Sequence, residues 1–191
     1  MLLPPLALLL AVLWPAPAPV QADPAIAARC EAARSIIAGQ IRAEEKPVII
    51  ISNRGFGDDK ISLTQFLRGW FRDEMPPHDL ADRFLATPHV ALLDACPDLP
   101  RTLARDGVEF GDEAANAMTE RVFNTLPLNL MSYPSNILGF SLPVLSPDGQ
   151  SAVMHSSATC GSVCGAGWVI WLKRDASGEW KTQSGRTSWI S

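Results

Sequence analysis

The stretch Trp168-Val169-Ile170-Trp171-Leu172-Lys173 decides the fold, because it is a short β-like segment that is apolar on both faces. Successive side chains of a strand point to opposite faces, so its first, third and fifth residues share one face, and Val169 and Trp171 share the other. A strand with two apolar faces is typical of a sheet that is covered on both sides. We therefore expect a two-sided core here, whereas an uncovered face would be a surface for a ligand or a partner.

Three more β-like segments lie in the last third of the chain, over residues 137–145, 152–159 and 180–190. The turn-forming sequences Ser146-Pro147-Asp148-Gly149 and Asp175-Ala176-Ser177-Gly178 separate neighbouring segments. Strands joined by such turns pair as antiparallel neighbours. The sequence therefore predicts a four-stranded antiparallel meander at the C-terminal end.

The first half of the chain is mainly helical in pattern. Residues 24–45 carry apolar side chains three or four positions apart, with Asp23 placed to cap the helix and Pro24 suited to its first turn. The apolar stripe consists of Ile26, Cys30, Ala33, Ile37 and Ile41. Further helices are predicted over residues 62–73, 79–87 and 112–123, and short strands over 47–51 and 90–93. We expect a single α+β domain over residues 23–191, with N-terminal helices packed on the C-terminal four-stranded antiparallel meander.

The N-terminal segment predicts export. Residues 1–14 are apolar, and no charged residue precedes Asp23. The apolar run is shorter than the roughly 20 residues of a spanning helix, and the three prolines over residues 15–19 would interrupt one. Val20-Gln21-Ala22 supplies the spacing of a cleavage site. The sequence predicts a signal peptide over residues 1–22, cleaved after Ala22, and a periplasmic or secreted protein with no stable membrane anchor after cleavage.

Composition limits the partners and the chemistry. The chain has 16 basic and 20 acidic residues and a formal net charge of −4. Mild acidity without clustered basic residues argues against nucleic acid, and also against an anionic membrane surface, as a partner. We find no complete catalytic or cofactor motif, so we expect no cofactor, assign no catalytic residue and favour a non-enzymatic role.

The four cysteines predict a covalent framework. Cys30, Cys96, Cys160 and Cys164 allow three pairings, and the sequence does not choose among them. An exported chain is expected to hold them oxidised. Local pairing of Cys160 with Cys164 leaves Cys30 with Cys96, a bridge that would stabilise the fold by about 3–4 kcal/mol. His155 with Cys160 and Cys164 is a conceivable metal site, but oxidised thiols disfavour it, and we expect no metal.

Tryptophans mark the candidate binding surface. Trp168, Trp171, Trp180 and Trp189 lie in the predicted sheet, and Asp148 is the only charged residue over residues 122–172. We expect this surface to bind a small molecule or another protein of the cell envelope.

Two enzymatic alternatives stay open. A strained Cys160–Cys164 ring would be reducible and could support thiol–disulfide chemistry, although redox pairs usually have C-x-x-C spacing at a helix start. Asp58 and Asp59, in a glycine-bearing loop after the first strand, could serve a hydrolase or a cation-dependent enzyme together with a histidine. A solvated turn is the simpler interpretation of that loop.

Several short segments of the C-terminal half form a recognisable pattern. They are Tyr133-Pro134-Ser135-Asn136, Phe140-Ser141-Leu142-Pro143-Val144, Asp148-Gly149, Ala152-Val153, residues 160–167 (CGSVCGAG), Leu172-Lys173, Gly178-Glu179-Trp180 and Ser188-Trp189-Ile190-Ser191. In these segments the chain resembles a family of secreted bacterial proteins with no established activity. The resemblance covers about 60 residues. It implies an exported domain with a C-terminal sheet and a cysteine loop, and it assigns no catalytic residue.

Overall fold

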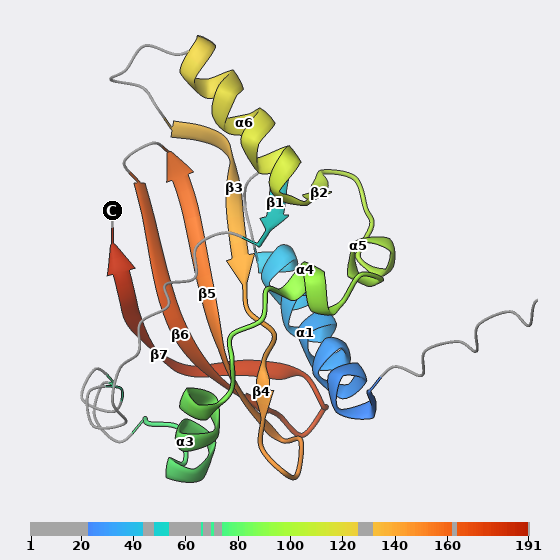
Figure 1. Cartoon of the computed structure of the whole chain (residues 1–191), viewed down its shortest axis with the longest axis vertical. Helices are drawn as coiled ribbons and strands as arrows, with labels where there is room; N and C mark the ends of the chain where they lie inside the picture. Colours follow the sequence, from blue (N-terminus) through green and yellow to red (C-terminus); the bar gives the residue numbers. More distant parts are fainter. Residues whose placement is uncertain are drawn as a thin grey trace, which may run out of the picture.

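The computed structural model of the chain describes residues 23–43, 48–53, 66, 70, 74–125, 132–161 and 164–190. The helices are α1 (Pro24–Ala43), α3 (His78–Ala86), α4 (Leu92–Ala95), α5 (Leu99–Thr102) and α6 (Asp112–Thr125). The strands are β1 (Val48–Ser52), β2 (Val108–Phe110), β3 (Ser132–Phe140), β4 (Val144–Leu145), β5 (Ser151–Gly161), β6 (Cys164–Arg174) and β7 (Trp180–Ile190). Figure 1 shows these strands side by side with the helices around them.

All strands belong to one seven-stranded sheet, in the order β2-β1-β3-β5-β6-β7, with β4 paired to β5. Strands β3, β5, β6 and β7 pair antiparallel in succession, which confirms the predicted meander. Strand β1 lies parallel to β3, and β2 lies parallel to β1. The α+β fold class is confirmed, and the sheet is wider than expected because β1 and β2 extend the meander beyond β3.

Helices cover both faces of the sheet. Helix α1 packs its buried isoleucines on one face, in a core that Leu172 of β6 and Ile51 of β1 share. The opposite face carries two clusters, one under α3 with Val169 and Trp171, the other under α6 with Ile50. Val169, Trp171 and Leu172 are all at most 7% exposed, so the two-sided core expected from the sequence is confirmed.

The start of α1 and the turns at residues 146–149 and 175–178 were predicted correctly from local sequence patterns. The Asp23 carboxylate accepts a hydrogen bond from the Ala25 N–H at 2.9 Å, as expected of a capping residue. Gly149 and Gly178 have φ values of 67° and 84°, a region that glycine adopts without steric cost, and each closes its turn. Ile26 departs from the predicted stripe, because it lies at the open end of α1 and is 39% exposed.

Other expectations need correction. Residues 90–93 do not form a strand, because Ala91 makes a single bridge to Ser141 and α4 begins at Leu92. The segment 137–145 is divided into β3 and β4, since Pro143 cannot donate to a strand ladder. Helix α3 begins at His78 and not at residue 79, because the chain enters that helix at Pro77, and Asp79 lies in its first turn. The helix predicted over residues 62–73 lies outside the described residues, apart from the buried Phe66 and Trp70.

Candidate functional site

A groove of about 710 Å³ lies between α1 and the first residues of β7, and we call it the α1–β7 groove. Its residues come from segments far apart in the sequence: Arg34, Ser35, Ile36, Ala38, Gly39, Gln40 and Arg42 of α1, Leu172 of β6, and Glu179, Trp180, Lys181 and Thr182 at the start of β7. Ile36 and Leu172 belong to the buried core, so they form an apolar base beneath a mainly polar rim. Such a volume falls within the range of about 300–1,000 Å³ that small-molecule sites occupy.

The groove is lined by three basic side chains and one carboxylate. The guanidinium of Arg34 is paired with Glu31 at 2.5 Å. The ammonium of Lys181 lies 2.7 Å from Glu179 and 3.8 Å from Asp175. Among the residues that the structure describes, Arg42 forms no ion pair. The groove is therefore basic in a chain whose net charge is −4.

Trp180 forms part of the groove wall. Its indole is partly buried against the core under α1, and the guanidinium of Arg174 lies 4.8 Å from the ring centroid. Cation–π contact and burial both hold the ring in place. The groove thus has one fixed aromatic wall facing the polar side chains of α1.

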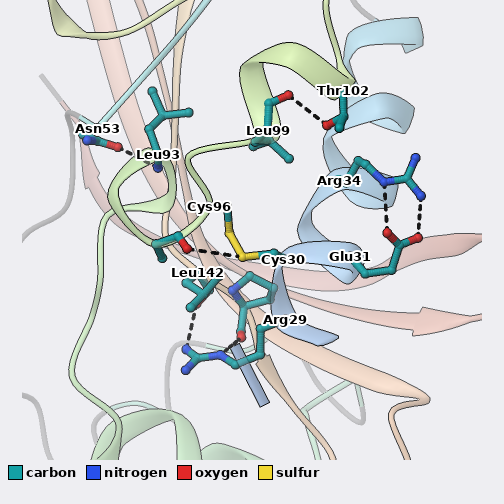
Figure 2. Close-up of a disulfide and its surroundings, with 12 residues drawn as sticks. Arg29, Cys30, Glu31, Arg34, Asn53, Leu93, Cys96, Leu99, Thr102 and Leu142 are labelled. Carbon is teal, nitrogen blue, oxygen red and sulfur yellow. Dashed lines mark hydrogen bonds and ion pairs between the residues drawn. A yellow bond between two sulfur atoms is a disulfide. The ribbon is translucent and has the colours of Figure 1, made fainter. Parts of the chain in front are cut away.

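The disulfide Cys30–Cys96 ties α1 to the end of α4. Figure 2 shows this disulfide, and beside it Arg29 of α1 pointing toward Leu142, in the segment between β3 and β4. The Arg29 Nε donates to the carbonyl of Pro143 at 2.6 Å, and its Nη2 donates to that of Leu142 at 3.4 Å. Burial lowers the pKa of Arg29 from its usual value. These contacts fix the position of α1, and therefore of the groove that it lines.

A second, apolar groove of about 370 Å³ lies beside the disulfide, between the first half of α1 and the α4–α5 segment. Ile26, Pro97 and Leu99 contribute apolar surface to it. Arg34 lines this groove as well as the α1–β7 groove, so the Arg34–Glu31 pair stands on α1 between the two.

Two histidines that are far apart in sequence meet on the opposite face of the sheet. The Nε2 atoms of His89 and His155 are 3.3 Å apart, and both rings contact Phe84. Burial, and then the neighbouring His89 and Arg186, lower the pKa of His155 to about 4. The His155 backbone is held by Ser141, whose hydroxyl accepts from the His155 N–H at 2.9 Å. This arrangement keeps His155 neutral in the folded protein at neutral pH.

The rings of His89 and His155 contact each other directly. Their centroids are 4.4 Å apart with the planes at 84°, so the rings lie edge to face, and the 3.3 Å between the two Nε2 atoms is a hydrogen-bonding distance. No group of three or more His, Cys, Asp or Glu side chains suited to a metal ion occurs within the described ranges.

The tryptophan side chains that the structure describes in the sheet lie on both of its faces. Trp171 is buried under α3, because its side chain points to the face opposite α1. Trp168 is partly exposed, and by strand alternation it shares the α1 face with Leu172. Of the four, Trp180 lines the α1–β7 groove, while the side chain of Trp189 lies outside what the structure describes. Trp171 therefore does not share a face with Trp168, and the role of the tryptophans in binding stays a prediction.

The remaining candidates are placed only in part. Cys164 is exposed and disulfide-bonded, whereas the side chain of Cys160 is not among those described, so their pairing stays a prediction. Asp58 and Asp59 lie outside the described residues. The Cys30–Cys96 bridge agrees with the expected pairing. Such a bond is typical of proteins that work in oxidising compartments, and within the described helices none is long and apolar enough to cross a bilayer.

Sequence reasoning missed the basic residues of the groove. Arg34 and Arg42 are ordinary surface residues of an amphipathic helix when the sequence alone is considered. Only one local signal was available, namely Gly39, because a glycine inside a helix costs about 1 kcal/mol relative to alanine and often has a packing or functional reason. Nothing in the sequence indicates that α1 lies against β7.

No family model, curated protein or solved structure matches the chain. The resemblance of its C-terminal half to secreted bacterial proteins therefore stays a prediction.

Proposed function

We propose that the protein is a non-enzymatic, exported binding domain whose ligand, a small molecule or a segment of an envelope protein, occupies the α1–β7 groove. The observation that carries this proposal is the groove itself, with its volume of about 710 Å³, its basic rim and its Trp180 wall. A concave site with an apolar base and a few polar groups is the usual form of a small-molecule site.

The proposal includes export through a signal peptide over residues 1–22, with cleavage after Ala22 and a periplasmic or secreted mature protein. The Cys30–Cys96 disulfide supports this location, since such bonds persist outside the reducing cytoplasm. N-terminal sequencing of the exported protein would test the cleavage site, and a mature protein that begins at Met1 would contradict it.

A matched pair of variants tests the groove. Ala38→Trp places an indole in the α1–β7 groove, whereas Ala28→Trp places one on the exposed surface of the same helix, outside both grooves. Each protein is purified from its export compartment and denatured, and the released small molecules are compared by mass spectrometry. We expect a species that wild type and Ala28→Trp carry and Ala38→Trp lacks.

Identical species from all three proteins, or none from any, would contradict a small-molecule role for the groove. A photo-crosslinking residue at Ser35, which also lines the groove, then tests the envelope-protein alternative. Crosslinks that Ala38→Trp does not reduce would contradict that alternative as well.

A thiol–disulfide role is the second candidate, favoured by one observation: Cys164 is exposed and disulfide-bonded. Accessible disulfides exchange with external thiols more readily than buried ones. Graded reduction followed by alkylation and mass mapping would test it. Opening of the Cys164 bond while Cys30–Cys96 stays closed supports this role, and resistance of the Cys164 bond to glutathione contradicts it.

A further inference from the structure

We propose that the α1–β7 groove recognises an anionic group, carboxylate or phosphate, on a small polar ligand, with Arg42 as the primary anchor and Gly39 as the position that gives the ligand access to it. This inference rests on the proposed function, because it names the ligand class of the same groove.

The first step concerns which cation is available. Arg34 and Lys181 already contact carboxylates, at 2.5 Å and 2.7 Å respectively. Arg42 also lines the groove, and it has no carboxylate partner within the described part of the chain. An arginine guanidinium presents several fixed donors that match the two oxygens of a carboxylate or phosphate. Among the described residues, Arg42 is therefore the groove cation that an incoming anion can bind without displacing a carboxylate.

The second step concerns the space next to Arg42. A Cβ atom built on Gly39 would meet the Nη2 atom of Arg42 at 3.8 Å, which is ordinary van der Waals contact, and no nearer atom of the described residues outside the helix backbone. The Arg42 side chain thus folds back along α1 over Gly39, and both residues line the groove. Since packing does not require glycine at this helical position, its missing side chain leaves the approach to the guanidinium open.

The third step concerns the groups around the anchor. Lys181 and Arg42 are close enough to repel each other, because the charge of Arg42 lowers the pKa of Lys181. The contact with Glu179 has the larger, opposite effect, so the pKa of Lys181 is raised overall. An anion bound between them relieves that repulsion. Ser35, Gln40 and Thr182 add hydroxyl and amide groups to the lining, so the ligand body is expected to be polar.

A structural role for Arg42 gives a different expectation. A basic residue in the last turn of a helix interacts favourably with the helix dipole, by about 0.3–1 kcal/mol. That role predicts a small change in stability on substitution and no effect on binding. The two roles are therefore separated by measuring binding and stability on the same variants.

The test uses two anions and a neutral compound. Citrate and inorganic phosphate are titrated by calorimetry into the full mature protein at low ionic strength, with galactose as the uncharged probe. We expect at least one anion to bind and galactose not to bind, and added salt to weaken the interaction. The stronger of the two anions identifies carboxylate or phosphate as the preferred group. Absence of binding by both anions at millimolar concentration would overturn the proposal.

Variants assign the binding to the groove. Arg42→Gln is expected to weaken anion binding about tenfold or more, because it removes a charged hydrogen-bonding partner. Gly39→Leu, which replaces glycine by a better helix former, should keep the fold and abolish binding by filling the approach. Arg101→Gln is the matched control, since Arg101 pairs with Asp98 on the exposed surface away from the groove. An equal loss in Arg42→Gln and Arg101→Gln would show non-specific attraction and overturn the assignment.

Failure of this inference is distinguishable from failure of the proposed function. If Ala38→Trp releases the species that co-purifies with the wild type while Arg42→Gln retains it, the groove is the ligand site and the anionic class is wrong. If Ala38→Trp does not affect anion binding, the anions bind outside the α1–β7 groove, and the inference that this groove recognises an anionic group is wrong.

Discussion

Protonation of His155 should make the folded protein lose stability in mildly acidic solution. An imidazole in the unfolded chain has a pKa near 6.5, whereas burial, with lesser contributions from His89 and Arg186, lowers the pKa of His155 in the folded protein to about 4. Between these values the unfolded state binds the extra proton, so lowering the pH favours unfolding. Above pH 6.5 both states are neutral and the full stability is present; below pH 4 both are charged and the loss is complete.

The magnitude follows from the difference between the two pKa values. At about 1.4 kcal/mol per pH unit the complete loss is about 3 kcal/mol, of which about 2 kcal/mol is reached by pH 5. For a domain of this size, a loss of 2 kcal/mol corresponds to a fall in melting temperature of roughly 4–8 °C. Hydrogen bonds lower the pKa of the carboxyl groups of Glu31, Asp148 and Asp175, so the contributions of these three groups are lost at still lower pH.

The assay is urea denaturation at about pH 7.5 and about pH 5, compared between wild type and His155→Gln. Glutamine stays neutral, so the variant should lose about 2 kcal/mol less than the wild type between these conditions, whatever its absolute stability. His78→Gln is the matched control, because His78 is exposed at the start of α3, and it should behave as the wild type. An equal pH dependence in wild type and His155→Gln would refute the reasoning.

Three further predictions concern stability. Replacing Cys30 and Cys96 together by alanine should lower the free energy of unfolding by about 4 kcal/mol in the chain-entropy model, because the bond closes a loop over a sequence separation of 66; a loss in urea denaturation of under about 1 kcal/mol would contradict this. Arg29→Met should cost about 1–3 kcal/mol, since two backbone carbonyls lose their donor. The exposed control Arg101→Met should cost less than about 1 kcal/mol, and similar losses in both would argue against a special role for Arg29. Gly39→Ala should raise the melting temperature, by about 0.5–1 kcal/mol of stability, because its position is helical and open, whereas Gly178→Ala should lower it by about 1 kcal/mol because φ there is 84°. A change of the same sign at both glycines would show that backbone conformation does not decide the effect.

Local patterns in the sequence were enough for the meander and for α1. The two apolar faces of β6 indicated a covered sheet, and the Asp23 cap with its helical stripe gave the start of α1. Short elements escaped detection, since β2 has three residues and α4 has four, too few for a periodicity to appear. Parallel pairing of β1 with β3 also has no local signature, because the two strands are joined by a long intervening segment.

The candidate site was less predictable than the fold, for a physical reason. Trp180 was identified as a candidate from its residue type, but two of the three basic side chains of the groove, Arg34 and Arg42, come from α1, more than a hundred residues earlier in the chain. A groove exists only where two packed elements leave space, so its lining depends on tertiary placement. The same holds for His89 and His155, which the sequence presents as unrelated imidazoles.

The position of β1 in the sheet has a consequence for how the chain folds. Strand β1 must pair with β3, whose residues follow it by more than eighty positions, so its neighbour is missing until the second half of the chain is available. Closing so long a loop costs entropy before any pairing compensates it, which slows folding. Both cysteines of the Cys30–Cys96 bond lie ahead of β3 in the sequence, so this bond can form first. It would then hold α1 near α4 while the sheet is still incomplete, and shorten the search of β1 for its partner. We therefore expect refolding of the oxidised protein to be faster than refolding of the reduced protein.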